Sequence, residues 1–156
     1  MKKIALLLIL FTQFGAKGAN LDSLFQSLNY RSSELQLEAL DSAYKSLRYA
    51  DSADFASFHL RALQVKLDWK EKTQLIYKGK YNMARWYVAH DQVAKGVLVL
   101  SQLSDEINAE QYPEIKAHVL ISLSSNYPEM GSIERALEYS LLAIDCLKFA
   151  QDTSFL

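Results

Sequence analysis

The sequence predicts an all-α protein built from about three antiparallel helical hairpins that stack side by side. Three observations predict this fold. Apolar residues recur at three- and four-residue intervals from Ser33 to Ala150, and no stretch alternates as a strand would. Only five glycines and two prolines interrupt 156 residues, half of which are hydrophobic. Finally, a shift of forty residues aligns the chain on itself.

The first eighteen residues have the three parts of a secretory signal peptide. Lys2 and Lys3 precede an apolar run that ends at Phe11, and Ala16 and Gly18 are small residues at the positions that a signal peptidase reads. We therefore expect cleavage after Gly18 and an exported protein, periplasmic or extracellular. An uncleaved anchor, the alternative, would need about 20 apolar residues. Cleavage would change the formal charge from -1 to -4, with 14 basic and 18 acidic side chains left.

After this segment we expect an N-terminal stretch, 19–33, with a short helix near 21–29, and then six longer helices. The six are expected at 34–49, 52–68, 71–89, 92–108, 113–127 and 132–150. Their starts and stops are marked by a capping-box pair, Ser33 and Gln36, by the N-cap candidates Asp51 and Asp91, by Pro113 in a first turn, and by Pro128 with Gly131 as a break. No further run is apolar and long enough to span a membrane.

Two of the expected helices have a clear apolar face. In 92–108 the face consists of Val93, Val97, Leu100, Leu103 and Ile107. In 132–150 it consists of Ile133, Ala136, Leu137, Ser140, Leu141, Ala143, Ile144 and Leu147.

The forty-residue repeat superposes small or apolar residues at four places. The sets are Ala56, Gly96 and Ala136; Leu60, Leu100 and Ser140; Leu63, Leu103 and Ala143; and Leu47, Tyr87 and Tyr127. We expect each set to lie where two packed helices touch, with the small residue letting the neighbouring helix approach. One hairpin cannot bury its own apolar face, whereas three stacked hairpins can.

This pattern resembles the tetratricopeptide-like repeats. The third unit matches with Leu120, Leu123, Ser124, Tyr127, Ala136 and Ala143, and the second with Lys80, Met83, Ala84, Tyr87, Gly96 and Leu103. The first unit offers Leu47, Ala56 and Leu63 but has Tyr44 where a small residue belongs. The period is forty rather than about 34, and Lys148 stands in place of the closing proline. A plain antiparallel bundle is the alternative.

The resemblance implies a short right-handed solenoid over 34–152, whose concave side is lined by the first helix of each hairpin and binds peptides or partner proteins. It implies no chemistry. Similar repeat regions also form the extracytoplasmic sensor portion of larger bacterial signalling proteins, which is an alternative function. Solenoids usually end in a polar capping helix. Residues 153–156 stand where a fourth unit would begin, so we expect a tail or the start of a missing repeat, with self-association through the last hairpin or a fragment of a longer protein.

The sequence holds no recognisable catalytic motif, so we expect no enzyme, cofactor or metal. His59, His90 and His118 are too far apart for a short metal motif, and Cys146 lies among apolar residues as a buried, inert thiol would. A small exported hydrolase or metal protein on a helical bundle remains the alternative. The near-balanced charge argues against a nucleic-acid partner. Trp69, Tyr77, Tyr81, Trp86 and Tyr87, interleaved with lysines, are interpreted as core aromatics beside a solvated basic face.

The repeat register also predicts a binding groove. Residues two, six and nine places before Leu47, Tyr87 and Tyr127 should face the concave side: Lys45, Asp41 and Glu38; Arg85, Tyr81 and Lys78; Ser125, Ile121 and His118; Arg48 falls on the same side. We expect Lys45, Arg48, Lys78, Tyr81, Arg85, His118 and Ser125 to form a partner-binding strip that selects acidic peptides. A terminal-carboxylate clamp of the family type would need an asparagine on this face, and Asn82 is one step out of register. Alternatively, the cations only solvate the face.

Overall fold

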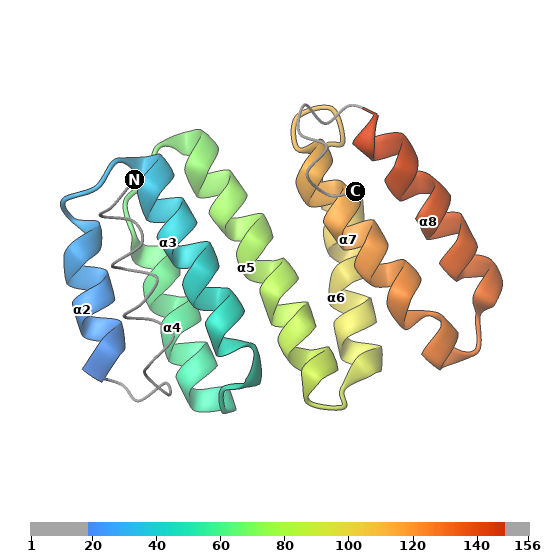
Figure 1. Ribbon diagram of the computed structural model, residues 1–156, viewed down its shortest axis with the longest axis horizontal. Coiled ribbons are helices and arrows are strands. Elements are labelled where there is room, and N and C mark those ends of the chain that lie inside the picture. Colours follow the sequence, from blue (N-terminus) through green and yellow to red (C-terminus); the bar gives the residue numbers. More distant parts are fainter. Residues whose placement is uncertain (1–18, 149–156) are drawn as a thin grey trace, which may run out of the picture.

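A computed structural model describes residues 19–148, and in this range the chain is all-helical, without strands (Figure 1). The seven α-helices are α2 (Ala19–Leu28), α3 (Ser33–Ser46), α4 (Ser52–Gln64), α5 (Trp69–Ala89), α6 (Val93–Glu106), α7 (Pro113–Asn126) and α8 (Ile133–Leu147). Two short 3-10 turns, η1 (Leu47–Tyr49) and η2 (Pro128–Met130), follow α3 and α7. The predicted all-α class is therefore confirmed. The predicted signal peptide, its cleavage site and the tail 153–156 lie outside the described residues.

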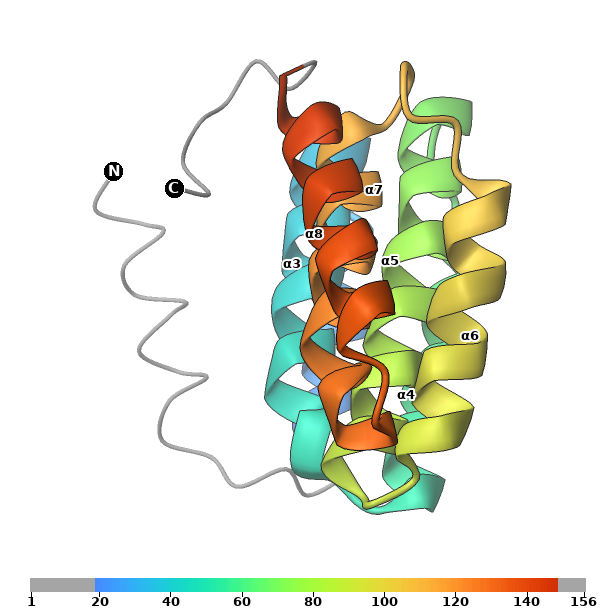
Figure 2. The same ribbon diagram turned by 90° about the vertical axis from the view of Figure 1, so that its right-hand side faces the viewer.

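Helices that are close in the sequence are grouped together across the molecule. Figure 1 shows α2, α3 and α4 at one end, α5 in the middle, and α6, α7 and α8 at the other end. The most extensive pairings are α5 with α6 and α7 with α8, and α3 and α7 both contact α5. In Figure 2, α3, α7 and α8 lie on one side and α6 on the other. None of the helices in 19–148 is long and apolar enough to cross a bilayer.

Two apolar clusters form the core, and α5 contributes to both. The first joins α2, α3, α4 and the α5 residues Leu75 and Trp86. The second joins α6, α7, α8 and Ala84 of α5. Because α5 has buried residues on both sides, it ties the two halves of the described chain together.

The repeat register is confirmed in the second and third hairpins. Leu100 and Leu103 of α6 are buried, as are Ala136 and Ala143 of α8. Gly96 lies so close to α5 that a Cβ atom there would be 2.6 Å from Val88 Cγ2 and 2.9 Å from the Ala84 carbonyl oxygen. The small residue thus allows the close helix approach that the repeat predicted.

In the first hairpin Leu47 is buried as predicted, but the predicted register of α4 is wrong. Ala56 is exposed, and Leu60 is 62% exposed. Instead α4 buries Phe55, Phe58 and Ala62, which turns the helix by about one residue relative to the other two.

The cause is Tyr44 of α3, which stands at the predicted small position and is fully buried. Its ring meets Phe58 edge-on at 4.7 Å, and its hydroxyl lies 2.7 Å from His59 Nδ1. The small residue of this contact is Gly79 of α5, where a Cβ atom would lie 3.1 Å from the Tyr44 hydroxyl oxygen. At this contact the large residue, Tyr44, is therefore on α3, and the small residue, Gly79, is on α5.

Three of the predicted helix boundaries are confirmed in detail. Asp51 caps α4 by accepting a hydrogen bond from the Asp54 backbone N–H at 2.8 Å. Pro113 is the first residue of α7, where its missing N–H costs no hydrogen bond. Gly131, with φ of 76°, follows the turn that Pro128 begins.

Two other capping predictions are wrong. Ser32, not Ser33, is the N-cap residue of α3, and Ser33 Oγ accepts a hydrogen bond from the Asp68 backbone N–H. The Gln36 side chain reaches back to α2 instead of closing a capping box. Asp91 has a φ of 59° and lies in the turn between α5 and α6. Gln92, not Asp91, is the residue that directly precedes α6.

The predicted apolar face of α8 is divided between core and solvent. Small residues, Ala136, Ala143 and Cys146, are buried, and Ser140 and Leu147 are half-buried. Large residues on the other side are exposed: Ile133 (73%), Leu137 (62%), Leu141 (55%) and Ile144 (55%). The helix therefore presents an apolar stripe to solvent.

Candidate functional site

The structure brings most of the predicted strip together on neighbouring parts of α3, α5 and α7. Lys45 comes from α3, Lys78 and Arg85 from α5, and His118 from α7. His118 is half-buried, and this burial is the main reason that its pKa lies below the usual value of 6.5. Lys45, Lys78 and Arg85 lower the pKa further, so all three cations act on one imidazole.

Asp41 of α3 is the acidic member of this cluster. Its carboxylate lies 3.0 Å from Lys45 Nζ and 3.7 Å from Lys78 Nζ, and its side chain is only 17% exposed. It also raises the pKa of His118, against the effect of the three cations. Asp41 pairs with two of the three cations, and three cations against one carboxylate leave this group of residues with an excess of positive charge. We call Asp41, Lys45, Lys78, Arg85 and His118 the cationic cluster.

Tyr81 provides an aromatic surface beside the cationic cluster. Its ring centre lies 6.1 Å from that of His118, and the Arg85 guanidinium carbon lies 5.6 Å from the centre of the Tyr81 ring. Its hydroxyl is 3.1 Å from Ser122 Oγ on α7. These contacts hold the ring between α5 and α7. Ser122 is a contact that the repeat register did not predict, because only residues at the three chosen spacings were considered.

Arg48 and Ser125, the remaining members of the predicted strip, make local contacts. Arg48 lies in η1, and its guanidinium carbon is 5.5 Å from the ring centre of the adjacent Tyr49. Ser125 is exposed, and its hydroxyl donates a hydrogen bond to the Ile121 carbonyl one turn earlier in α7. Glu38 is exposed near the start of α3.

The other candidate reactive groups take part in packing. His59 bonds to Tyr44, and His90 Nδ1 lies 2.8 Å from the Trp86 carbonyl oxygen, with the two rings stacked at 4.1 Å. Cys146 is buried as predicted, and burial raises its thiol pKa, which disfavours the reactive thiolate. Within residues 19–148 no group of three or more His, Cys, Asp and Glu side chains is arranged to hold a metal ion.

The aromatic residues around α5 divide between core and surface. Trp86 is buried, and its indole N–H donates to the Ala50 carbonyl at 2.8 Å. Tyr77 packs edge-on against Tyr112. Trp69 is 84% exposed, so the prediction of core aromatics is wrong for this residue.

We expect the free energy of unfolding to fall as the pH is lowered below about 6.5. Burial lowers the pKa of both His59 and His118 in the folded protein. In acid the unfolded chain therefore binds more protons than the folded one, and it is stabilised. Urea unfolding at about pH 7.5 and about pH 5.5 measures the difference. The variant His118→Gln should show a smaller difference, and an equal or greater stability of the wild type in acid would contradict the assignment.

Comparison of the chain with protein-family models, with curated proteins and with solved structures finds no match.

Proposed function

We propose that this chain is an exported, non-enzymatic helical scaffold of the tetratricopeptide-like type that binds an acidic peptide or protein segment across α3, α5 and α7. The observation that carries the proposal is the convergence of Lys45, Lys78 and Arg85 on His118, with Asp41 as the acid among them. Lys45 and Lys78 share the single carboxylate of Asp41, so an acidic segment would add carboxylates to a cluster in which cations outnumber acids.

The geometry favours binding over mere solvation of the face. Lys78 and Asp41 have side chains that are 30% and 17% exposed, so their charges are partly removed from water. Charge-assisted hydrogen bonds are stronger in such places than on an open surface. Tyr81 adds an apolar contact beside the charges. These features suit a segment that alternates acidic and apolar side chains.

The hydrolase alternative would need a reactive side chain that faces a pocket. Cys146 is instead buried with a raised thiol pKa, and the half-buried His59 and His90 are held by hydrogen bonds to Tyr44 and to the Trp86 carbonyl. The sensor alternative predicts the same binding face within a larger protein. The scaffold proposal and the sensor alternative are therefore tested by the same binding experiment.

The double variant Lys78→Ala/Arg85→Ala should weaken the binding of acidic peptides by about 10- to 100-fold at low salt, because two charge-assisted contacts are lost. An array of short random peptides first identifies the wild-type binders, which should be enriched in Asp and Glu. Their affinities are then measured for both proteins at low and high salt, and the salt dependence should shrink in the variant.

The matched control is Lys95→Ala/Lys148→Ala, which removes the same charge from exposed positions on α6 and at the end of α8. It should retain the wild-type preference. Binders without an acidic bias, or equal losses in both double variants, would contradict the cationic-cluster proposal.

We also propose that the apolar stripe of α8 (Ile133, Leu137, Leu141 and Ile144) pairs with α8 of a second copy. In the forty-residue register, Leu137 and Ile144 correspond to Val97 and Ser104 of α6, which are buried. α6 contacts α7, and the Lys116 side chain of α7 donates to the Ser104 carbonyl. α8 thus exposes positions that α6 uses for helix packing. Because the stripe has no charged side chain, two copies can pack against each other here without burying a charge from the stripe.

A further inference from the structure

His118, the one imidazole of the cationic cluster, lies at the contact between α7 and α5. Its ring centre is 6.1 Å from that of Tyr81 on α5. The Tyr81 hydroxyl is 3.1 Å from Ser122 Oγ, and Ser122 is one turn after His118, so the tyrosine packs along this part of α7. The imidazole is half-buried. Charges in the cluster therefore act on it with less screening than on an open surface.

Two of the cations that act on His118 belong to α5. Lys78, Tyr81 and Arg85 follow one another at three- and four-residue spacing, which places them on one side of this helix. The Arg85 guanidinium carbon is 5.6 Å from the centre of the Tyr81 ring, and the same ring is the neighbour of His118. A ligand that contacts this side of α5 therefore also comes close to the imidazole.

α3 provides the third cation and the carboxylate of the cluster. Asp41 lies 3.0 Å from Lys45 Nζ and 3.7 Å from Lys78 Nζ. On α7 itself, Glu114 is exposed one turn before His118. α6 and α8 also pack on α7, but among the described residues the four charged side chains with the largest effects on His118 come from α3 and α5. The charge around the imidazole is therefore set mainly by the helices across which we propose that an acidic segment binds.

An acidic ligand would reverse part of the effect that keeps His118 neutral. In the free protein, burial and the three cations lower the pKa of His118, so the ring is neutral at neutral pH. A bound segment would bring carboxylates to the same cations. Negative charge nearby favours the imidazolium, so the pKa of His118 would be higher in the complex. A group whose pKa rises on binding takes up a proton, and by linkage the binding becomes stronger as the pH falls.

We propose that the cationic cluster binds its acidic segment together with a proton, which His118 takes up from the solvent. The imidazolium would then be a fourth cation in contact with the bound acids. The protein would hold an acidic segment more tightly in mildly acidic surroundings and release it more readily at neutral pH. This inference rests on the proposed function and adds the proton as a second ligand of the same site.

The test uses as its probe the peptide Asp-Leu-Asp-Leu-Asp, acetylated and amidated at its ends, whose carboxylates stay ionised between about pH 5.5 and pH 7.5. Calorimetric titration of the protein at both pH values should show binding that is about three- to tenfold tighter at the lower pH, since a pKa rise of one unit corresponds to a tenfold change. NMR of the histidine-labelled protein should show that saturating peptide raises the pKa of His118.

Two histidine variants identify the group that takes up the proton. His118→Gln should bind the peptide with nearly the same affinity at both pH values. The matched control is His90→Gln, which changes a histidine that stacks on Trp86 and does not belong to the cationic cluster. This control should keep the wild-type dependence on pH.

The outcomes separate this proposal from the one on which it rests. Binding of equal strength at the two pH values, or a pKa of His118 that the peptide leaves unchanged, would overturn proton-linked binding while the acidic-segment site stands. A pH dependence that survives His118→Gln would also overturn it. A peptide that fails to bind at either pH would contradict the acidic-segment site and, with it, the uptake of a proton there.

Discussion

Replacing Gly96 with alanine should destabilise the protein, although alanine is a better helix former than glycine by about 1 kcal/mol. The added Cβ atom would lie 2.9 Å from the Ala84 carbonyl oxygen, which is backbone and cannot rotate away, and 2.6 Å from Val88 Cγ2. α5 and α6 would have to separate. Overpacking of this kind costs about 1–3 kcal/mol. Because one of the two contacts is with backbone, we expect the upper part of this range, about 2–3 kcal/mol. After the gain in helix propensity, the net loss should be about 1–2 kcal/mol, measured as a lower urea midpoint.

The matched control reverses the substitution on the same helix. Ala94 is exposed two residues before Gly96, so Ala94→Gly changes helix propensity without altering the contact with α5. It should cost about 1 kcal/mol. The two substitutions are opposite in chemistry, yet both should destabilise, and only close packing explains this result. A Gly96→Ala variant as stable as the wild type would show that α5 and α6 are not held this closely.

The helices could be predicted from the sequence because most of them have an apolar face that is buried. Leu100 and Leu103 recur at helical spacing and are also core residues, so periodicity and packing agree in α6. The register of α4 could not be predicted in this way. The forty-residue alignment compares single positions, whereas the large residue at Tyr44 is accommodated by Gly79 on another helix. A pair of compensating residues on two helices leaves no trace in such an alignment.

The cationic cluster could be predicted to a large extent, because residues at helical spacing share a face wherever the helix is regular. Lys78 and Arg85 lie within the long helix α5, and both act on His118 as the register required. Arg48 differs because α3 gives way to a 3-10 turn at Leu47. Each residue of such a turn rotates by about 120° rather than 100°, which redirects the Arg48 side chain.

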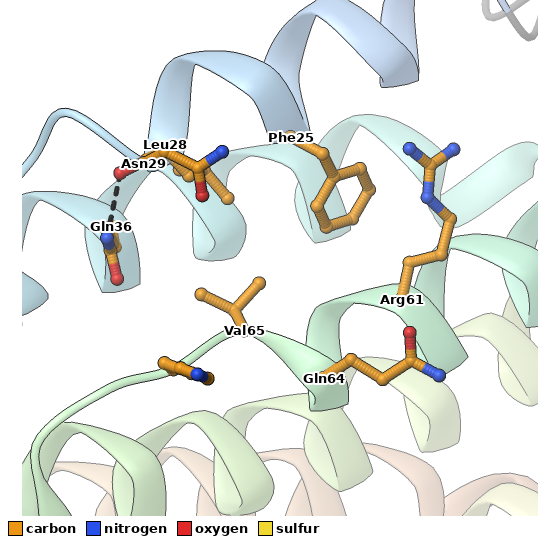
Figure 3. Close-up of a pocket in the computed structure, with 8 residues that line it drawn as sticks. Phe25, Leu28, Asn29, Gln36, Arg61, Gln64 and Val65 are labelled. Atoms are coloured by element: carbon orange, nitrogen blue, oxygen red, sulfur yellow. Dashed lines mark hydrogen bonds between the residues drawn. The ribbon is translucent and has the colours of Figure 1, made fainter.

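The pocket beside Gln36, between α2, the start of α3 and the end of α4 (Figure 3), could not be predicted, because three separate stretches of the chain build it. The sequence suggested that Gln36 belongs to a capping box with Ser33, on the basis of their spacing. In the structure its amide instead donates to the carbonyls of Leu28, the last residue of α2, and of Arg31 in the loop that follows. Gln36 has these hydrogen-bond partners only because α2 packs on α3 and α4.

The paired substitution Leu137→Glu/Leu141→Lys should convert a self-associated protein into a monomer. The two leucines are 62% and 55% exposed in one copy, and we propose that a second copy covers them. Burial of a half-exposed leucine contributes about 1 kcal/mol, and four such side chains meet in a symmetric pair. Their loss amounts to about 4 kcal/mol, or about a thousandfold in the dimer dissociation constant. Sedimentation equilibrium over a wide concentration range measures the change.

The design keeps the helix and the net charge intact, so that a loss of pairing cannot be attributed to unfolding. Glutamate four residues before lysine favours a helix, and the two charges cancel. Leu98→Glu/Gln102→Lys places the same pair at exposed positions of α6 and serves as the matched control. It should associate as the wild type does. A wild-type protein that stays monomeric at high concentration would contradict pairing through α8, and a dimer that survives Leu137→Glu/Leu141→Lys would place the contact on another surface.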